Sequence, residues 1–419
     1  VEGKHNKIPL SREIGGIKYS RVKAEVKSIS EERINYDFHV DTSLEWNVIK
    51  EKEDWSVDLP SGSYLVTALA GFGKSVLTKK QPEYFREDTL RLGFTNVACE
   101  NLSSDNQVCH TLNSYFGIDF NTGKGSEKKL KNLREIKCII LTEAFMTPVY
   151  LMGYLSMIKE QFPEIKFICE GDPEQIRPVK EEHINWLEKD LFHKLCDGNL
   201  VKLIYNKRND EESNYDKILT GLRLDDEKYG TRAPQIMNIC KTNKMRVSIN
   251  HEMMDRSGYF ISKSRENSKS QDVWITQATP IMCVKNDKDL GLMNGKMCEV
   301  SCIDKTAHVV IVKNGYGLLR MRASDFAKHF VVAYAVTNHK VQGITIRVNY
   351  NIYEWNQMSR REQYTAYSRT ADGNLVKIIE TYATLSSSSA TLDKLWEDLR
   401  TFFRENYCIY KWSSSECNH

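Results

Sequence analysis

Between residues 63 and 171 the chain alternates apolar, strand-like segments with helix-like segments, and this alternation most limits the folds it can adopt. The expected strands are 63–70, 90–98, 137–141 and 165–171, and the expected helices are 74–85 and 152–162. Strands that alternate with helices pair in one parallel sheet with helices on both faces. Ligands of such α/β sheets bind where the strands end.

The segment ALAGFGKS, residues 68–75, lies between the first expected strand and the first expected helix. It matches the phosphate-loop template G-x-x-x-x-G-K-[ST] at Gly73, Lys74 and Ser75, with Ala68 in place of the first glycine. A strand, a tight turn and a helix form the context in which such a loop binds phosphate. The expected nucleotide contacts are Ala70, Gly71, Phe72, Gly73, Lys74, Ser75 and Val76.

A phosphate loop needs an acid at the end of a neighbouring strand to hold Mg²⁺ and polarise the attacking water. The segment CIILTEAF supplies Glu143, so we predict that Ser75 and Glu143 bind the metal. Thr142 takes the place of the aspartate that usually precedes this glutamate. Either the Thr142 hydroxyl holds a metal-bound water, or the affinity for the metal is weakened and hydrolysis is slow.

Composition narrows the choice of partners and compartment. The 59 Lys and Arg residues nearly balance the 56 Asp and Glu residues, so a nucleic acid would be bound by a local groove and not by the net charge of +3. The 11 cysteines form no C-x-x-C pair, Cys298 and Cys302 being the nearest approach, and several lie in apolar segments. This pattern favours a reducing compartment inside the cell, the nucleus or the cytoplasm.

No segment predicts membrane insertion or secretion. The longest apolar stretch, FVVAYAV, is much shorter than the about 20 residues that span a bilayer, and the N-terminus lacks a signal-peptide core. The first residue is Val and not Met, which leaves open whether the chain is a piece of a larger protein.

Four further motifs follow in a fixed order: CEGDPEQIRPV, LIYNKRND, YAVTNHKVQGITI and QYTAYSRTADGN. Together with the phosphate loop they resemble, from Ser63 to Ile379, the motifs of superfamily 1 helicases of the RecD-like and Pif-type branch. The resemblance implies an α/β fold of two RecA-like parallel-sheet cores, with a small SH3-like β-barrel inserted in the second. The drift in the motifs suggests a virus or mobile element as the source.

The expected organisation has three parts. Residues 1–60 form an N-terminal region to which the sequence assigns no role. Residues 61–199 form the first core, with a wedge hairpin at 116–134, and residues 200–419 form the second core. The second core contains the insertion at about 273–329 and ends in an amphipathic helix at about 388–405.

The resemblance also implies roles for individual residues. The catalytic set is Lys74, Glu143, Gln175, Arg208 and Arg369, and Gly343 is a further nucleotide contact. Gln175 would touch the γ-phosphate, and both arginines would reach it from the second core when the cleft closes. The nucleic-acid contacts would be Thr95, His110, Thr111, Thr337, His339 and Lys340. Helix capping and ordinary loop polarity remain the alternative for this last group.

The implied activity is that of an ATP-dependent DNA helicase that uses ATP and Mg²⁺ and moves 5′ to 3′ on single-stranded or tailed duplex DNA. Three alternatives remain open: a viral-type superfamily 1 RNA helicase, a single-strand-binding module with a weakened ATPase, and an ATPase indifferent to nucleic acid. No glutamine precedes Gln81, so a base-reading glutamine upstream of the loop is absent and Trp46 or Trp55 could only stack on the base.

Overall fold

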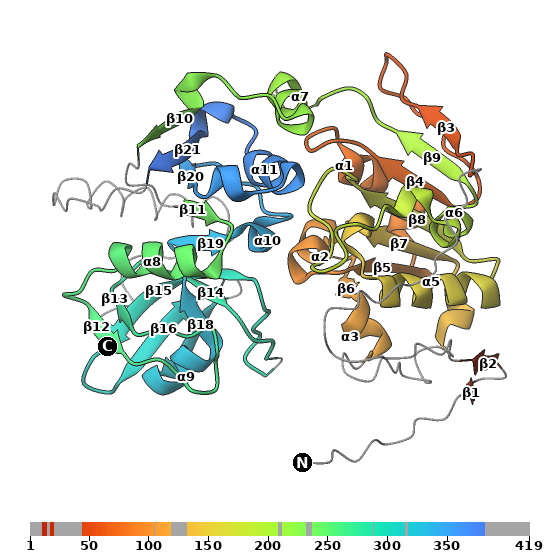
Figure 1. The fold of residues 1–419 in the computed structure, drawn as a ribbon. Coiled ribbons are helices and arrows are strands. Elements are labelled where there is room, and N and C mark those ends of the chain that lie inside the picture. Colours follow the sequence, from red (N-terminus) through yellow and green to blue (C-terminus); the bar gives the residue numbers. More distant parts are fainter. Residues whose placement is uncertain are drawn as a thin grey trace, which may run out of the picture.

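The computed structural model describes residues 11–14, 17–20, 44–104, 106–118, 132–207, 212–231, 237–287, 289–314 and 317–381. Within this part of the chain two lobes lie side by side, each with its own hydrophobic core (Figure 1). A short antiparallel hairpin, β1 (Ser11–Ile14) with β2 (Ile17–Ser20), precedes them. Arg208, most of the predicted wedge hairpin and the predicted helix at 388–405 lie outside the described residues.

The first lobe contains a seven-stranded parallel sheet in the order β3-β9-β4-β8-β7-β5-β6. Its strands are β3 (Asn47–Lys50), β4 (Tyr64–Thr67), β5 (Thr89–Gly93), β6 (Cys109–Thr111), β7 (Cys138–Thr142), β8 (Lys166–Gly171) and β9 (Asn199–Lys202). The central strands β4 and β7 are buried along their whole length, as continuous apolar runs in a parallel sheet require. The α/β class predicted from the alternation is confirmed.

Helices surround this sheet: α1 (Lys74–Lys79), α2 (Asn96–Leu102), α3 (Leu112–Phe116), α5 (Val149–Gln161) and α6 (Asp190–Leu195). Short 3-10 turns are η1 (Pro82–Phe85), η2 (Asn132–Glu135), η3 (Ala144–Met146) and η4 (Trp186–Glu188). The predicted helix 74–85 is wrong beyond Lys79, because Pro82 lacks an amide hydrogen and starts a separate turn. The predicted strand 90–98 ends at Gly93, because Thr95 caps a helix instead.

The second lobe contains a five-stranded parallel sheet in the order β10-β21-β20-β11-β19. Its strands are β10 (Tyr229–Thr231), β11 (Met237–Cys240), β19 (Ala335–Thr337), β20 (Tyr350–Ile352) and β21 (Val376–Thr381). Its helices are α7 (Glu212–Thr220), α8 (Asn243–Met253), α10 (Asn338–Val341) and α11 (Arg360–Tyr367), with 3-10 turns η5 (Asp226–Lys228), η6 (Trp355–Gln357) and η7 (Gly373–Leu375). In Figure 1, α10 and α11 lie on the side that faces the first lobe.

Between β11 and β19 the chain forms a separate antiparallel sheet in the order β17-β16-β15-β14-β18. Its elements are β14 (Pro280–Cys283), β15 (Met297–Asp304), β16 (Val309–Lys313), β17 (Leu318–Arg322), α9 (Ala323–His329) and β18 (Phe330–Val332). The hairpin of β12 (Tyr259–Ile261) and β13 (Val273–Ile275) precedes it. This sheet occupies most of the range 273–329, and its assignment as an SH3-like barrel stays a prediction.

The first sheet also extends beyond the range in which the sequence shows clear strands. β3, from the N-terminal region without an assigned role, pairs with β9 at the edge of the sheet. Glu51, the residue after β3, has a buried carboxylate that accepts hydrogen bonds from the amides of Ile204 and Tyr205 at 3.1 and 3.2 Å. These bonds tie the N-terminal segment to the chain that leaves the first sheet.

Candidate functional site

The loop after β4 has the backbone shape that its glycines predict. Gly71 and Gly73 have φ angles of 88° and 91°, a region in which a side chain is strained. Lys74 begins α1 and folds back over the loop, donating hydrogen bonds to the carbonyls of Ala68 at 2.8 Å and Leu69 at 3.0 Å. Ala68, which stands in place of the first glycine of the template, is buried, and the turn forms with this residue present.

A buried carboxylate that the sequence did not single out lies next to this loop. Glu170, on β8, accepts hydrogen bonds from the hydroxyls of Ser75 at 3.0 Å and Thr142 at 2.8 Å through Oε1, and of Thr78 at 2.7 Å through Oε2. Glu170 is the second residue of the motif CEGDPEQIRPV, but the resemblance assigned it no role, because the residues it assigned there follow the strand. Ser75, predicted to bind Mg²⁺, and Thr142, whose part in metal binding the sequence left open, thus share one hydrogen-bond partner.

Glu143, predicted to be catalytic, follows β7 with a left-handed backbone, φ 51°. A non-glycine residue in this conformation is strained, and such residues cluster at functional sites. Burial raises the pKa of its carboxyl group, and the positive charges of Lys74 and Arg369 partly oppose this effect. Glu170 and Asp172 raise the pKa further. Lys74 of the first lobe and Arg369 of the second therefore act on the same carboxylate.

Tyr364, on α11 of the second lobe, links two segments of the first lobe through one oxygen. Its buried hydroxyl accepts a hydrogen bond from the amide of Ala70 at 2.7 Å and donates one to Oδ2 of Asp172 at 2.8 Å. The same Asp172 oxygen accepts the Gln175 side-chain amide at 3.0 Å. Oε1 of Gln175 is buried and has no hydrogen-bond partner, so it can accept a bond from a ligand at this position.

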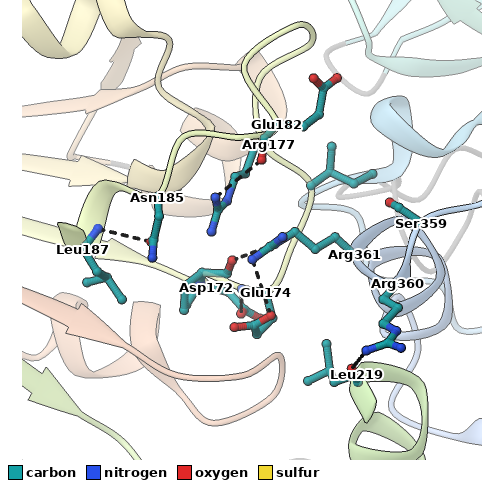
Figure 2. A network of polar contacts seen from close by, with 12 residues as sticks. Asp172, Glu174, Arg177, Glu182, Asn185, Leu187, Leu219, Ser359, Arg360 and Arg361 are labelled. Atoms are coloured by element: carbon teal, nitrogen blue, oxygen red, sulfur yellow. Dashed lines mark hydrogen bonds and ion pairs between the residues drawn. The ribbon is translucent and has the colours of Figure 1, made fainter. Parts of the chain in front are cut away.

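Further contacts between the lobes lie beside this link. The amide of Ile176 donates to the Thr365 hydroxyl at 3.0 Å. Figure 2 shows Arg361 extending from α11 toward the segment after β8, where it donates to the Pro173 carbonyl at 3.3 Å and lies 3.9 Å from a Glu174 carboxylate oxygen. The segment that contains Gln175 is therefore held from the second lobe at several points.

Arg369, an arginine predicted to come from the second lobe, is buried and follows α11, whose end holds its side chain. Its Nε donates to the Thr365 carbonyl at 2.7 Å, and a terminal nitrogen donates to the Ser368 hydroxyl at 2.9 Å. No carboxylate of the described residues lies within ion-pair distance of it. The second predicted arginine, Arg208, lies outside the described residues.

Lys207 and Trp55 also lie beside the loop and were not predicted as a pair. The amide of Lys207 donates to the Gly71 carbonyl at 3.3 Å, and its Nζ lies 2.5 Å from the buried carboxylate of Glu51. A Cβ on Gly73 would come within 3.0 Å of the Lys207 side chain, so the lysine covers this glycine closely. The same Nζ lies 5.7 Å from the centre of the exposed Trp55 ring. Trp46, in contrast, packs against Phe192.

The residues predicted to contact nucleic acid lie at the start of α2, on β6, at the end of β19 and on α10. The hydroxyl of Thr95 caps α2 and that of Thr111 caps α3, so both threonines have the capping role that the sequence left as an alternative. Thr337 occupies the N-cap position of α10 without a side-chain cap. His110 is exposed on β6 and packs against Tyr115.

Two predicted contacts on α10 carry or can carry positive charge. Burial lowers the pKa of His339, with Glu362 and Glu182 opposing, and its buried Nε2 has no hydrogen-bond partner. Burial also lowers the pKa of Lys340, whose Nζ donates to Oδ1 of Asn294 at 3.1 Å. Gly343, predicted to contact the nucleotide, accepts a hydrogen bond from Asn101 of α2 at 2.5 Å. Gly343 therefore lies beside α2.

The group of oxygen donors around Ser75 fits Mg²⁺, which binds one or two carboxylates together with substrate phosphates. Ser75 and Glu143 offer hard oxygen atoms of the required type, and the carboxylate of Glu170 accepts a hydrogen bond from the Ser75 hydroxyl. No cluster of three or more His, Cys, Asp or Glu residues in the described part of the chain could hold a metal ion by itself. The site is suited to a cation that arrives with phosphate.

Comparison with known proteins bears on the fold. No family model matches the chain, and no curated protein matches it. Among solved structures the chain is similar to Pif1 helicases. The Bacteroides Pif1 helicase in complex with ADP-AlF3 and ssDNA has a TM-score of 0.58 and 17% identity, over 82% of this chain and 94% of that one. Bacteroides Pif1 bound to ssDNA has a TM-score of 0.59 and 18% identity, over 83% of this chain and 95% of that one. The Pif1 helicase from Candida albicans has a TM-score of 0.55 and 18% identity, over 81% of this chain and 95% of that one. The chain thus has the fold of these helicases. In its described part no helix has the length and apolar character needed to cross a membrane.

Proposed function

We propose that the chain is an ATP-dependent helicase that translocates on single-stranded DNA, in the 5′ to 3′ direction. The observation that carries this proposal is the hydroxyl of Tyr364, which joins the loop residue Ala70 to Asp172 across the two lobes. A motor of this kind needs nucleotide groups on one lobe that respond to the position of the other. The Pif1 structures of the same fold were solved with ssDNA and with a nucleotide analogue.

In this proposal the phosphate loop binds the ATP phosphates, with Lys74 and the backbone amides of residues 71–76 as donors. Mg²⁺, held through Ser75 and the neighbouring carboxylates, would neutralise charge on the phosphates. Glu143 accepts the proton of the attacking water, a role for which a raised pKa is suited. The free Oε1 of Gln175 accepts a bond from the nucleotide or its water.

Arg369 supplies the charge of the second lobe. Its guanidinium is fixed by two hydrogen bonds within the lobe and has no acid partner among the described residues, so it is available to a phosphate. An arginine that reaches a transferring phosphate from another domain is worth about 10³- to 10⁵-fold in rate. Hydrolysis then depends on the distance between the lobes, and a change in that distance moves the DNA-binding elements α2 and α10 relative to one another.

The experiment measures Mg²⁺-dependent ATP hydrolysis with and without oligo-dT, followed by unwinding of 5′-tailed and 3′-tailed duplexes made of DNA and of RNA. We expect strong stimulation by oligo-dT, unwinding of the 5′-tailed DNA duplex, and loss of both activities in Lys74→Ala. Binding of oligo-dT without ATP hydrolysis would support the single-strand-binding module with a weakened ATPase. ATP hydrolysis that oligo-dT does not change would support the ATPase indifferent to nucleic acid. Preference for the RNA duplex would support the RNA helicase.

A further inference from the structure

Glu170 is a buried acid in the middle of the candidate site, and no role was assigned to it from the sequence. It is 2% exposed, and its two oxygens accept three hydroxyl hydrogen bonds, from Ser75, Thr78 and Thr142. In the described part of the chain no lysine, arginine or histidine forms an ion pair with it. A buried carboxylate without a counter-ion is costly, and it attracts a cation that can reach it.

The position of Glu170 is tied to the unusual residue at 142. β7 and β8 are parallel neighbours in which Leu141 pairs with Cys169, so Thr142 and Glu170 are the next residues along the two strands. The Thr142 hydroxyl donates to Oε1 of Glu170 at 2.8 Å. Thr142 thus stands in place of the usual aspartate at the end of β7, while the adjacent residue on β8 is the acid Glu170.

The hydrogen bonds also orient the hydroxyl of Ser75. A hydroxyl group has one proton to donate and two lone pairs. Because Ser75 gives its proton to Glu170 at 3.0 Å, its lone pairs are free to bind a cation. The bond from Thr78 at 2.7 Å fixes the other carboxylate oxygen, so Glu170 cannot turn away from Ser75 without losing this contact.

We propose that Glu170 supplies, from β8, the carboxylate that Thr142 does not supply from β7. It holds the Ser75 hydroxyl in position for Mg²⁺ and adds the negative charge that retains the ion beside the nucleotide phosphates. This inference rests on the proposed nucleotide site. Glu170 is a positioning residue, and it provides on β8 the second carboxylate that an aspartate at position 142 of β7 would provide.

The test measures how much Mg²⁺ strengthens binding of a fluorescent ADP to the full chain, by titration with and without the metal. Glu170→Gln keeps the size of the side chain and its capacity to accept a hydrogen bond but removes the charge. We expect its Mg²⁺-dependent gain in affinity to fall by roughly 10- to 100-fold, with binding in the absence of Mg²⁺ unchanged. Adding Thr142→Asp to this variant should restore the gain, which a purely structural role would not produce.

Glu164→Gln is the matched control, since Glu164 is exposed and lies two residues before β8. It should bind nucleotide with the same Mg²⁺ dependence as the unmodified chain. If Glu170→Gln does not fold, as judged by circular dichroism, the exchange variant Thr142→Asp with Glu170→Thr decides the question: retained Mg²⁺ dependence supports the inference and its loss overturns it.

The outcomes separate this inference from the proposed function. An unmodified chain that binds no nucleotide overturns both. If the unmodified chain and the Glu170→Gln variant both bind nucleotide with the same Mg²⁺ dependence, the role of Glu170 is overturned. The proposed nucleotide site then still stands.

Discussion

A single hydroxyl group, that of Tyr364, is the smallest feature on which the proposed coupling between the lobes depends. Tyr364→Phe leaves the buried Ala70 amide without its hydrogen-bond partner and removes one of the two hydrogen bonds to Oδ2 of Asp172. A buried polar group left unpaired costs about 1–3 kcal/mol. We expect the free energy of unfolding to fall by this amount in chemical denaturation. Stimulation of ATP hydrolysis by oligo-dT should fall more than basal hydrolysis.

Tyr367→Phe is the matched control for this prediction. Tyr367 lies on the same helix and is equally buried, but its hydroxyl accepts a hydrogen bond from Asn214 at 3.1 Å within the second lobe. Loss of this hydrogen bond should lower the free energy of unfolding without changing the ratio of oligo-dT-stimulated to basal ATP hydrolysis. A ratio that is unchanged in Tyr364→Phe would contradict the coupling role.

Glu143 provides a prediction about pH. Burial raises the pKa of its carboxyl group above the usual 4.5. The folded chain therefore binds this proton more tightly than the unfolded chain, and folding loses stability as the pH rises from about 4.5 through the raised pKa. Glu143→Gln removes this loss, so we expect it to be more stable than the unmodified chain near neutral pH, with the difference shrinking toward about pH 4.

Thermal unfolding at several pH values measures this difference. The same variant should lose ATP hydrolysis by about 10²- to 10⁴-fold, the range for removal of a general base. A difference in stability that does not change with pH would mean that Glu143 titrates alike in the folded and unfolded chains.

For single residues, the sequence predicted those to which a motif assigns a role and missed those to which it assigns none. Lys74, Ser75, Glu143 and Gln175 were predicted from short patterns, and the structure places them at adjoining strand ends, while their catalytic roles stay predictions. Glu170 was missed because its buried carboxylate depends on hydroxyl donors from two separate segments, α1 and β7. Such a set cannot be read from spacing along one strand.

Among the elements, the edge strand β3 gives a test of how the N-terminal segment supports the site. Glu51, directly after β3, binds two backbone amides and Lys207. In Glu51→Ala these amides lose their partner, so we expect the free energy of unfolding to fall by about 1–3 kcal/mol in urea denaturation. Glu53→Ala changes an exposed acid two residues away and should have an effect within about 0.5 kcal/mol.

Element types were easier to predict than element ends. Long apolar runs identified β4, β7 and β8, because burial on both faces leaves a continuous signal. The ends depended on single residues: Pro82 stopped α1 early, and the Thr95 hydroxyl started α2 where a strand had been expected. β3 was not predicted, because four residues at a sheet edge show no clear pattern until their partner β9 is known.

The two lobes together should respond to the nucleotide as one molecule. Ala70 of the phosphate loop packs within the hydrophobic core of the second lobe, and Glu143 lies in the field of charges from both lobes. A ligand at 100 times its dissociation constant stabilises the folded state by about 2.7 kcal/mol. We therefore expect a Mg²⁺-bound ATP analogue to raise the unfolding temperatures of both lobes in scanning calorimetry.

Lys74→Ala should abolish this shift. A rise confined to one unfolding transition, with the other unchanged, would show that the ligand contacts one lobe alone, and it would remove the basis for a motor that works by changing the distance between them.

The two bonds of the Tyr364 hydroxyl have a consequence for the sequence of events in a cycle. Because one oxygen makes both bonds, the loop and the acid cannot be released separately on this side: moving α11 away breaks both together. In the cycle that we propose, nucleotide would bind before α11 reaches the Ala70 loop, and the hydrolysed nucleotide would leave after α11 withdraws. A strict order of steps would thus be set by geometry and not by differences in rate.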